Sequence, residues 1–195
     1  GRPCTLPNGS GDLLTPSALF FDEDDVVVGK EAVKSSTVTP DAYAECFKRD
    51  MGSVRLHRKV RGLDVPPEVL GAFVLQRLKR DAERRLGPVR KAVITVPAFF
   101  DETRRRATQD AGRLAELEVL DIINEPTAAA VAYGHARGLL ELSPSGGKTI
   151  RQRVLVYDLG GGTFDVTILE IEGARFRAVA TDGDVLLGGK DFDER

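Results

Sequence analysis

Hydrophobic positions repeat at helical spacing in some segments of this chain and at strand spacing in others, so the pattern predicts an α/β protein. The clearest helix is expected to begin with Pro66 or Pro67 in its first turn and to stop at Gly87-Pro88. Its apolar positions are Leu70, Phe73, Val74, Leu78, Ala82 and Leu86. The apolar run 92–96 predicts a strand buried on both faces of a sheet, which ends at Pro97.

Helix and strand patterns alternate after Pro97. We expect a helix capped by Asp101, a strand over residues 119–123, and a second helix from Pro126 to a stop at Gly138. The order strand, helix, strand, helix is typical of an α/β layer architecture.

The first third of the chain carries shorter patterns. Residues 17–21 and 26–28 flank an acidic turn and predict a hairpin. Residues 31–59 are mixed and favour a small subdomain of short elements, with one or two turns of helix around Lys48. From the residues alone, Lys48 is a surface lysine.

The segment that carries the candidate chemistry is residues 154–171, where two apolar, β-branched stretches flank three glycines. This pattern predicts a hairpin, because glycine tolerates turns with positive φ. Three residues without Cβ also let a ligand approach the main chain, so Gly160, Gly161 and Gly162 can cradle a phosphate with their N–H groups. Asp158 and Asp165 stand at the two ends of the turn, and we expect magnesium between them, held through water. The alternative is a hairpin that only turns.

Residues beyond this hairpin continue the sheet. Residues 176–181 predict a third strand, Asp182-Gly183 a turn, and Leu187-Gly188-Gly189 the approach to a helix at Lys190. A glycine pair near a helix N-terminus is a second candidate anion contact.

The polar stretch 139–153 predicts a crossover between two lobes. Its Gly147-Lys148-Thr149 end does not complete a P-loop, because Leu142 stands where the first glycine of that motif would be.

Two polar features are unusual for a purely structural role. Arg104, Arg105 and Arg106 fall in the first turn of a helix, where the macrodipole disfavours positive charge; the alternative is a solvated basic face. Glu125 follows a strand and opens a helix, at the edge of an α/β sheet where ligands bind. The alternative there is a helix cap made by Asn124.

Composition limits the function classes. The chain has 195 residues, of which 42% are hydrophobic and 30% charged, and a net charge of −2. This composition is typical of a globular protein and lacks the strongly basic balance that indicates nucleic-acid binding. Cys4 and Cys46 have no metal or redox spacing, and we expect a reducing, cytoplasmic location. No apolar run has the length of a membrane span, and no signal peptide is visible. Because the chain begins Gly1-Arg2, we expect it to be cut from something longer.

Three ordered motifs then carry a family resemblance. They are Val93-Ile94-Thr95-Val96-Pro97-Ala98-Phe99-Phe100, Ile122-Ile123-Asn124-Glu125-Pro126-Thr127-Ala128-Ala129-Ala130 and Asp158-Leu159-Gly160-Gly161-Gly162-Thr163-Phe164-Asp165. Together they resemble the nucleotide-binding domain of the seventy-kilodalton heat-shock chaperones of the DnaK type. The resemblance covers nearly the whole chain and is strongest over residues 88–195.

The resemblance implies an actin-like ATPase fold, with two ribonuclease H-like lobes and ATP between them. It implies phosphate contacts from Gly160, Gly161, Gly162, Thr163 and Gly189. Asp158 and Asp165 would hold magnesium, potassium or their water shell.

The same resemblance assigns four further residues. Glu125 would hold the metal-bound or attacking water, and Lys48 would be the catalytic lysine. Pro97 and Arg105 would be the proline switch and partner arginine that relay the nucleotide state, which supplies a reason for the first-turn arginines, while Arg104 would lie on the solvated face.

The chain also departs from the family pattern. The first phosphate loop and the adenosine-binding helix are absent, Lys190 stands where an acidic residue is usual, and residues 52–66 are shorter, which changes the surface for an exchange factor. We therefore expect a partial fold. Residues 1–150 would be a first lobe lacking its opening strands, with a small inserted subdomain at about 17–64, and residues 151–195 the first strands of the second lobe.

The function expected is that of a truncated chaperone ATPase domain, inactive by itself, whose parent hydrolyses ATP to control client binding by a separate downstream domain. Expected partners are client polypeptides, a J-domain co-chaperone and a nucleotide exchange factor, with no nucleic acid and no membrane. The alternatives are a sugar-kinase-like phosphotransferase of the same superfamily, and a nucleotide-binding scaffold without turnover.

Overall fold

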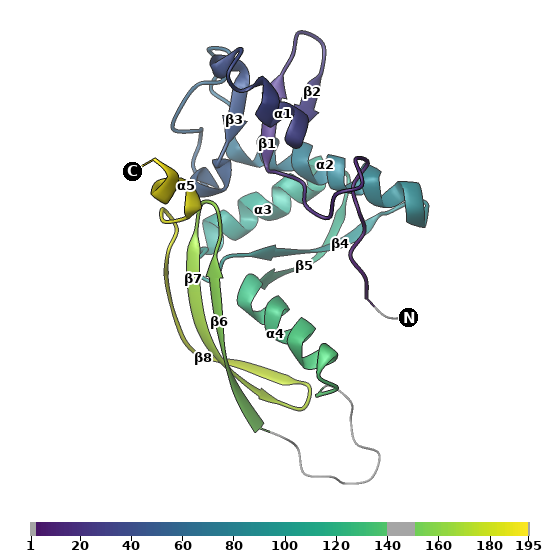
Figure 1. Ribbon diagram of the computed structural model, residues 1–195, viewed down its shortest axis with the longest axis vertical. Coiled ribbons are helices and arrows are strands. Elements are labelled where there is room, and N and C mark those ends of the chain that lie inside the picture. The colour runs from purple at the N-terminus through teal and green to yellow at the C-terminus, as the bar shows by residue number, and fades with distance from the viewer. Residues whose placement is uncertain (1–2, 140–150, 195) are drawn as a thin grey trace. The chain divides into compact units, whose positions relative to one another are not determined.

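The computed structural model describes residues 3–139 and 151–194, and it is an α/β structure, as the sequence pattern predicts. The chain divides into two compact units (Figure 1). Unit 1 comprises residues 1–93 and 102–121, and unit 2 comprises residues 94–101 and 122–195.

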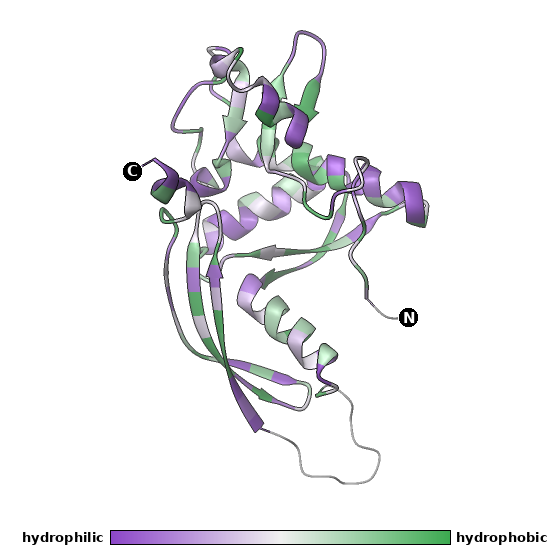
Figure 2. Cartoon of the chain, in the orientation of Figure 1, coloured by the Kyte–Doolittle hydropathy of each residue, from purple (hydrophilic) through white to green (hydrophobic). Residues whose placement is uncertain are grey.

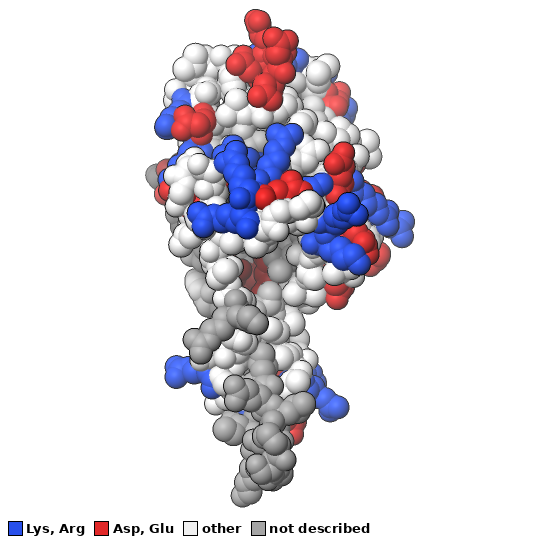
Figure 3. Space-filling view, turned by 90° about the vertical axis from the view of Figure 1, so that its right-hand side faces the viewer, with Lys and Arg blue, Asp and Glu red and all other residues white. Residues whose placement is uncertain are grey.

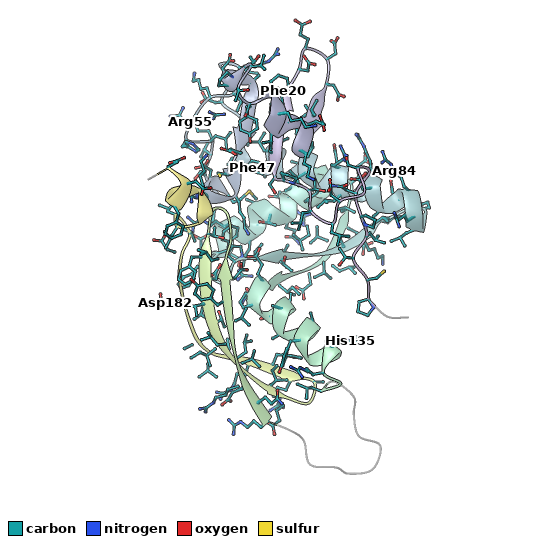
Figure 4. The ribbon with its side chains drawn as sticks, viewed as in Figure 1. Phe20, Phe47, Arg55, Arg84, His135 and Asp182 are labelled. Carbon is teal, nitrogen blue, oxygen red and sulfur yellow. The ribbon has the colours of Figure 1, made fainter. Side chains whose placement is uncertain are left out.

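Unit 1 opens with the predicted hairpin. Strand β1 (Ala18–Phe21) pairs antiparallel with β2 (Val26–Val28) on one side and with β3 (Tyr43–Glu45) on the other. Helix α1 (Lys30–Ser35) and the 3₁₀ turn η1 (Pro40–Ala42) connect β2 to β3. The larger apolar cluster of this subdomain includes Phe47, labelled in Figure 4. Its buried members are Leu19, Val28, Ala44, Phe47, Leu56, Val60 and Leu70. A second, smaller cluster consists of Ala18, Ala32 and Tyr43.

The segment around Lys48 is a 3₁₀ turn, η2 (Phe47–Asp50), and not an α-helix. Cys46 precedes it with a left-handed φ of 56°, a conformation that ends β3 abruptly. The short turn explains why the sequence pattern in this region is weak.

Helix α2 (Pro67–Leu86) confirms the clearest prediction, and Gly87 ends it with a φ of 73°. It packs on α3 (Glu102–Leu114). A Cβ on Gly71 would lie 3.2 Å from the Cβ of Ala111, so glycine allows the two helices to approach closely. Figure 2 shows hydrophobic and hydrophilic positions alternating along both helices, as expected of helices with one covered face.

Strands β4 (Lys91–Val96) and β5 (Glu118–Asn124) form a two-stranded sheet within the described residues. Both strands were predicted, but burial of β4 on both faces is wrong. Exposure alternates along β4, and Val93 remains 50% exposed. An apolar run of this kind can therefore belong to a strand with only one covered face.

Unit 2 contains helix α4 (Glu125–Ala136) and an antiparallel meander of β6 (Arg151–Leu159), β7 (Phe164–Glu172) and β8 (Arg175–Asp184). The helix packs on one face of this sheet, where Ala130, Leu169 and Ile171 form a buried cluster. The predicted crossover at residues 139–153 lies mostly outside the described residues.

The turn predicted at Asp182-Gly183 is wrong, because both residues belong to β8 and Gly183 pairs with Asp165 of β7. A Cβ on Gly183 would overlap the carbonyl oxygen of Phe164. The glycine serves the close approach of two strands, which a sequence pattern does not distinguish from a turn.

Charged side chains of both signs mix on the surface. On the described part of the face in Figure 3, basic and acidic side chains are interspersed and do not form one large basic surface. Exposed ion pairs elsewhere on the described surface include Lys34–Glu31 at 2.7 Å and Arg113–Asp110 at 3.2 Å. Within the described residues, no helix has the length and apolar character needed to cross a membrane.

Candidate functional site

The glycine turn between β6 and β7 is a closed hairpin loop, as predicted. Leu159 pairs with Phe164, and the N–H of Gly160 donates to the carbonyl of Thr163 at 2.9 Å. Neither Gly160 nor Gly161 has a left-handed φ, so the expectation that these two glycines provide positive φ is wrong. The loop needs glycine for another reason.

Part of that reason is a second glycine segment packed on the turn. A Cβ on Gly188 would come within 2.5 Å of the backbone of Gly161. From the start of α5 (Gly189–Asp193), the N–H of Gly189 donates to the carbonyl of Gly160 at 2.9 Å, and that of Lys190 to Gly161 at 3.0 Å. Gly188 and Gly189 therefore hold the turn in place, while the phosphate contact expected of Gly189 stays a prediction.

Gly161 differs from its neighbours. Among the described residues, no heavy atom lies within 4 Å of the place that a Cβ on Gly161 would occupy. Because its φ is also not left-handed, neither the backbone conformation nor packing within the described chain requires glycine here. A residue without a side chain leaves room for a phosphate to approach the main chain, so the turn fits a nucleotide phosphate.

Two carboxylates flank this turn. Asp158 on β6 stands directly opposite Asp165 on β7, a position in which Cβ atoms are about 5 Å apart. Asp158 is half-buried, and Asp165 is only 3% exposed. Like charges at such positions repel one another, and a cation between them removes the repulsion.

The donor set suits a cation that keeps most of its water. Within the described residues, no group of three or more His, Cys, Asp or Glu side chains has metal-binding geometry. Magnesium binds in this manner, through one or two carboxylates, water and substrate phosphates. The pair Asp158 and Asp165 therefore fits magnesium better than it fits zinc, which takes a complete set of protein ligands in structural sites.

Thr163 and Glu125 belong to the same unit as the turn. Thr163 is buried and closes the loop through its carbonyl. Glu125 is half-buried and begins α4, and Asn124 occupies the N-cap position without a capping hydrogen bond from its side chain. The alternative that Asn124-Glu125 is only a helix cap therefore loses its main support.

The relay and lysine residues are divided between the units. Pro97, in unit 2, is fully buried directly after β4. Lys48 and Arg105, in unit 1, are both half-buried. The structure thus brings together Asp158, Asp165, Thr163 and the glycines of unit 2, while Lys48 lies on η2 and Arg105 in the first turn of α3.

Arg104 does not lie on a solvated face, which corrects the expectation for this residue. It is half-buried, and its backbone nitrogen and Cγ face Gly52. Arg106 is the exposed arginine of the three.

Sequence reasoning missed two positions that shape the site. Gly183 allows β8 to lie close to the backbone of Asp165 on β7, but the Asp182-Gly183 pattern predicted a turn. Gly52 attracted no interpretation, although it lies four residues after Lys48. A glycine that follows a candidate catalytic residue at such a short distance is a signal that would have found it.

The fold and the site define an α/β protein with a glycine hairpin and paired carboxylates suited to a metal-bound phosphate. The family model described as Hsp70 protein matches residues 1–195, and the chain belongs to this family. Membership implies an actin-like ATPase fold and, in general terms, a chaperone ATPase domain. Hsp70 proteins generally bind ATP or ADP with magnesium and act with clients and co-chaperones.

Proposed function

We propose that these residues form part of a chaperone ATPase domain that holds Mg-ATP at the β6–β7 glycine turn. The observation that carries the proposal is the open position at Gly161, a glycine that the described chain does not itself require. The opposed carboxylates of Asp158 and Asp165 beside that turn support it, because they call for a cation.

In this proposal the glycine turn and Thr163 contact the phosphates, with Gly189 as a further contact. Asp158 and Asp165 hold the magnesium shell or a potassium ion, and Glu125 positions the attacking water. Lys48 is the catalytic lysine of the family pattern and would supply a positive charge. These roles follow the family resemblance residue by residue, and the geometry of unit 2 is compatible with them.

Hydrolysis then needs positioning and charge stabilisation more than covalent chemistry. Asp158 and Asp165 would hold magnesium through its water shell, and the ion would supply positive charge against the charge that develops on the phosphate. Glu125 orients a water in line with the scissile bond, while backbone N–H groups of the turn and the Lys48 ammonium stabilise the transition state. The turn is prearranged for this task, because α5 holds it through two backbone hydrogen bonds.

The relay and the partners belong to the same proposal. Pro97 and Arg105 would transmit the nucleotide state to a separate substrate-binding domain that holds client polypeptides. A J-domain co-chaperone and a nucleotide exchange factor would regulate the cycle. Residues 1–150 and 151–195 would contribute to different lobes, with a small subdomain at about 17–64 inserted in the first.

Two alternative functions differ from this proposal in what happens to the phosphate of ATP. A sugar-kinase-like phosphotransferase would transfer phosphate to a sugar, whereas this domain would transfer it to water. A scaffold without turnover would bind ATP and never release phosphate. Phosphate release from ATP in the absence of any sugar argues against both.

Single-turnover hydrolysis of Mg-ATP by the intact protein tests the assigned roles. Catalytic donors and cations in such sites are each worth about 3 kcal/mol, so Lys48→Ala or Glu125→Ala should slow hydrolysis about a hundredfold. Nucleotide affinity should change little, because these groups act in the transition state.

Matched controls are Lys34→Ala and Glu172→Ala, which remove the same charges from exposed positions. Both controls should keep the wild-type rate. A wild-type rate in Lys48→Ala would show that the catalytic lysine is elsewhere, and an unchanged rate in Glu125→Ala would remove that residue from the mechanism.

A further inference from the structure

Gly52, in the segment that carries Lys48, lies close to the first turn of helix α3. Its φ is +85°, and a Cβ there would lie 3.1 Å from Cγ of Arg104, 3.2 Å from the Arg104 nitrogen and 3.2 Å from Cγ2 of Thr103. All three atoms belong to the first turn of α3, within unit 1. The backbone at Gly52 therefore rests directly on that turn.

The Lys48 turn is anchored on both sides. Phe47, directly before Lys48, is buried in the core cluster of unit 1. Met51 is buried too, and its N–H donates to the Lys48 carbonyl at 3.4 Å. Nδ1 of His57 lies 2.7 Å from Oδ2 of Asp50, within hydrogen-bond distance. Lys48 thus lies on a short turn with little freedom, between a core anchor and the contact at Gly52.

We infer that Gly52 is a positioning residue, which sets the place of Lys48 by letting the η2 turn rest on the first turn of α3. The inference rests on the proposed role of Lys48 in ATP hydrolysis. Any side chain at position 52 would push the turn and the helix apart by a few tenths of an ångström, because contacts of 3.1 to 3.2 Å are too short for a Cβ. A group that acts by position loses activity on displacement.

Through the same contact, the position of α3 affects the position of Lys48. The first turn of α3 carries Arg104 and Arg105, so a shift of this turn would move Lys48 as well. At Gly52, the η2 turn and the first turn of α3 therefore constrain each other's position.

The test compares Gly52→Ala with Gly11→Ala in the intact protein. Gly11 has the same φ of +85°, and within the described residues nothing lies within 4 Å of its Cβ position, so this control carries the backbone strain without the contact. We expect Gly52→Ala to slow single-turnover ATP hydrolysis about three- to tenfold, since a displacement of about 1 Å can cost a hundredfold. The dissociation constant and the binding stoichiometry for Mg-ATP should stay unchanged, and Gly11→Ala should hydrolyse at the wild-type rate.

A rescue variant separates positioning from general damage. Thr103→Ser with Arg104→Ala removes two of the three atoms that a Cβ at position 52 would meet. Added to Gly52→Ala, the two changes should restore part of the lost rate. If Gly52→Ala does not fold, the pair alone decides, because it loosens the contact from the helix side and should slow hydrolysis about threefold.

Lys48→Ala, measured in parallel, distinguishes the two ideas. If Lys48→Ala is slow but Gly52→Ala has the wild-type rate, the positioning inference is overturned and the proposed function stands. Where Gly52→Ala fails to fold, a wild-type rate in the variant with Thr103→Ser and Arg104→Ala has the same meaning. If Lys48→Ala has the wild-type rate, the proposed role of the lysine fails. Equal loss in Gly52→Ala and Gly11→Ala, or a lower binding stoichiometry in Gly52→Ala, would assign the effect to strain or unfolding and overturn the inference.

Discussion

At the scale of single residues, the glycines of this chain perform different tasks that the sequence does not separate. Gly188 and Gly183 permit close backbone contacts, whereas Gly161 faces open space. Gly52 combines a left-handed φ with a close contact. A glycine in a sequence indicates that a side chain is not tolerated at that position. Only the structure shows whether the backbone conformation, close packing or space for a ligand is the reason.

The positions of the two aspartates on either side of the turn were easier to predict than their pairing across it. Asp158 and Asp165 were expected on either side of the turn, and the structure places them directly opposite each other. Arg104 was assigned to solvent because helix periodicity alone does not show which side of a first turn meets another segment. Its contact comes from Gly52, about fifty residues earlier in the chain.

The arginines of α3 give a test at this scale. If Arg105 is the partner of Pro97 in the relay, Arg105→Ala should leave basal ATP hydrolysis near normal and weaken ATP-triggered release of a client peptide. Arg106→Ala is the matched control, because Arg106 is exposed one position further along the same turn. Equal effects of the two substitutions on peptide release, measured by fluorescence, would favour a simple basic face.

At the scale of elements, the strong periodic patterns were the ones that predicted correctly. Helix α2 and the β1–β2 and β6–β7 hairpins were all expected from spacing and turn residues. Strand β8 is longer than predicted, because Asp182 and Gly183 continue its pairing with β7. A turn of helix was expected around Lys48, but its 3₁₀ type and its bounds at Phe47–Asp50 were not, because so short an element shows no repeated hydrophobic pattern.

The sheet of unit 2 also carries a charge cluster that spacing alone did not reveal. The Glu170 side chain on β7 is 6% exposed and pairs with Arg151 at 2.8 Å, Arg153 at 2.9 Å and Arg177 at 2.5 Å. These guanidinium groups come from β6 and β8, so the cluster ties all three strands together. Hydrogen bonds from Arg177, Arg151 and Arg153 lower the pKa of Glu170 from 4.5 to about 2.

This cluster predicts a specific dependence of stability on pH. Because the folded pKa of Glu170 is depressed, its contribution is fully present above pH 4.5 and is lost as pH falls towards about 2. Thermal melting across that window should show a steeper acid loss in the wild type than in Glu170→Gln. The exposed Glu172→Gln should follow the wild-type curve, and a Glu170→Gln curve parallel to the wild type would contradict the cluster's role.

At the scale of the whole molecule, the family match covers residues 1–195 and the structure divides them into two units. Class and family could be predicted from three long motifs, because such motifs are specific when they occur in order. The boundary between lobes expected near residue 150, from the change of composition before β6, stays a prediction; in the structure, unit 2 also includes residues 94–101 and 122–139. The site of an ATPase with two lobes depends on parts distant in sequence, and no local pattern describes their contacts.

The 195-residue chain by itself should be inactive. The described residues provide one glycine hairpin of the phosphate-binding kind, and a site that is short of even about 4 kcal/mol of nucleotide contacts binds roughly a thousandfold more weakly. Within the described residues, β4 and β5 form a sheet of only two strands, whose open edges favour pairing with another copy. We expect no measurable ATP turnover, at best millimolar binding, and some self-association.

Calorimetric titration with Mg-ATP beside light scattering checks this expectation on one sample. The control is the same titration of the intact protein, which should bind ATP far more tightly. A monodisperse monomer of the 195-residue chain that binds ATP in the micromolar range would contradict it.

The central claim is that a nucleotide phosphate occupies the space beside Gly161, and one substitution addresses it. Gly161→Val adds a side chain whose Cβ, among the described residues, has no other part of the chain within 4 Å, so the fold should tolerate it. Ala174→Val is the matched control, in the exposed turn at the other end of the same sheet. Calorimetry of the intact protein should show Mg-ATP binding weakened at least about a hundredfold in Gly161→Val, with an unchanged melting temperature and wild-type binding in Ala174→Val. Wild-type affinity in a folded Gly161→Val protein would show that the glycine turn does not hold the phosphates.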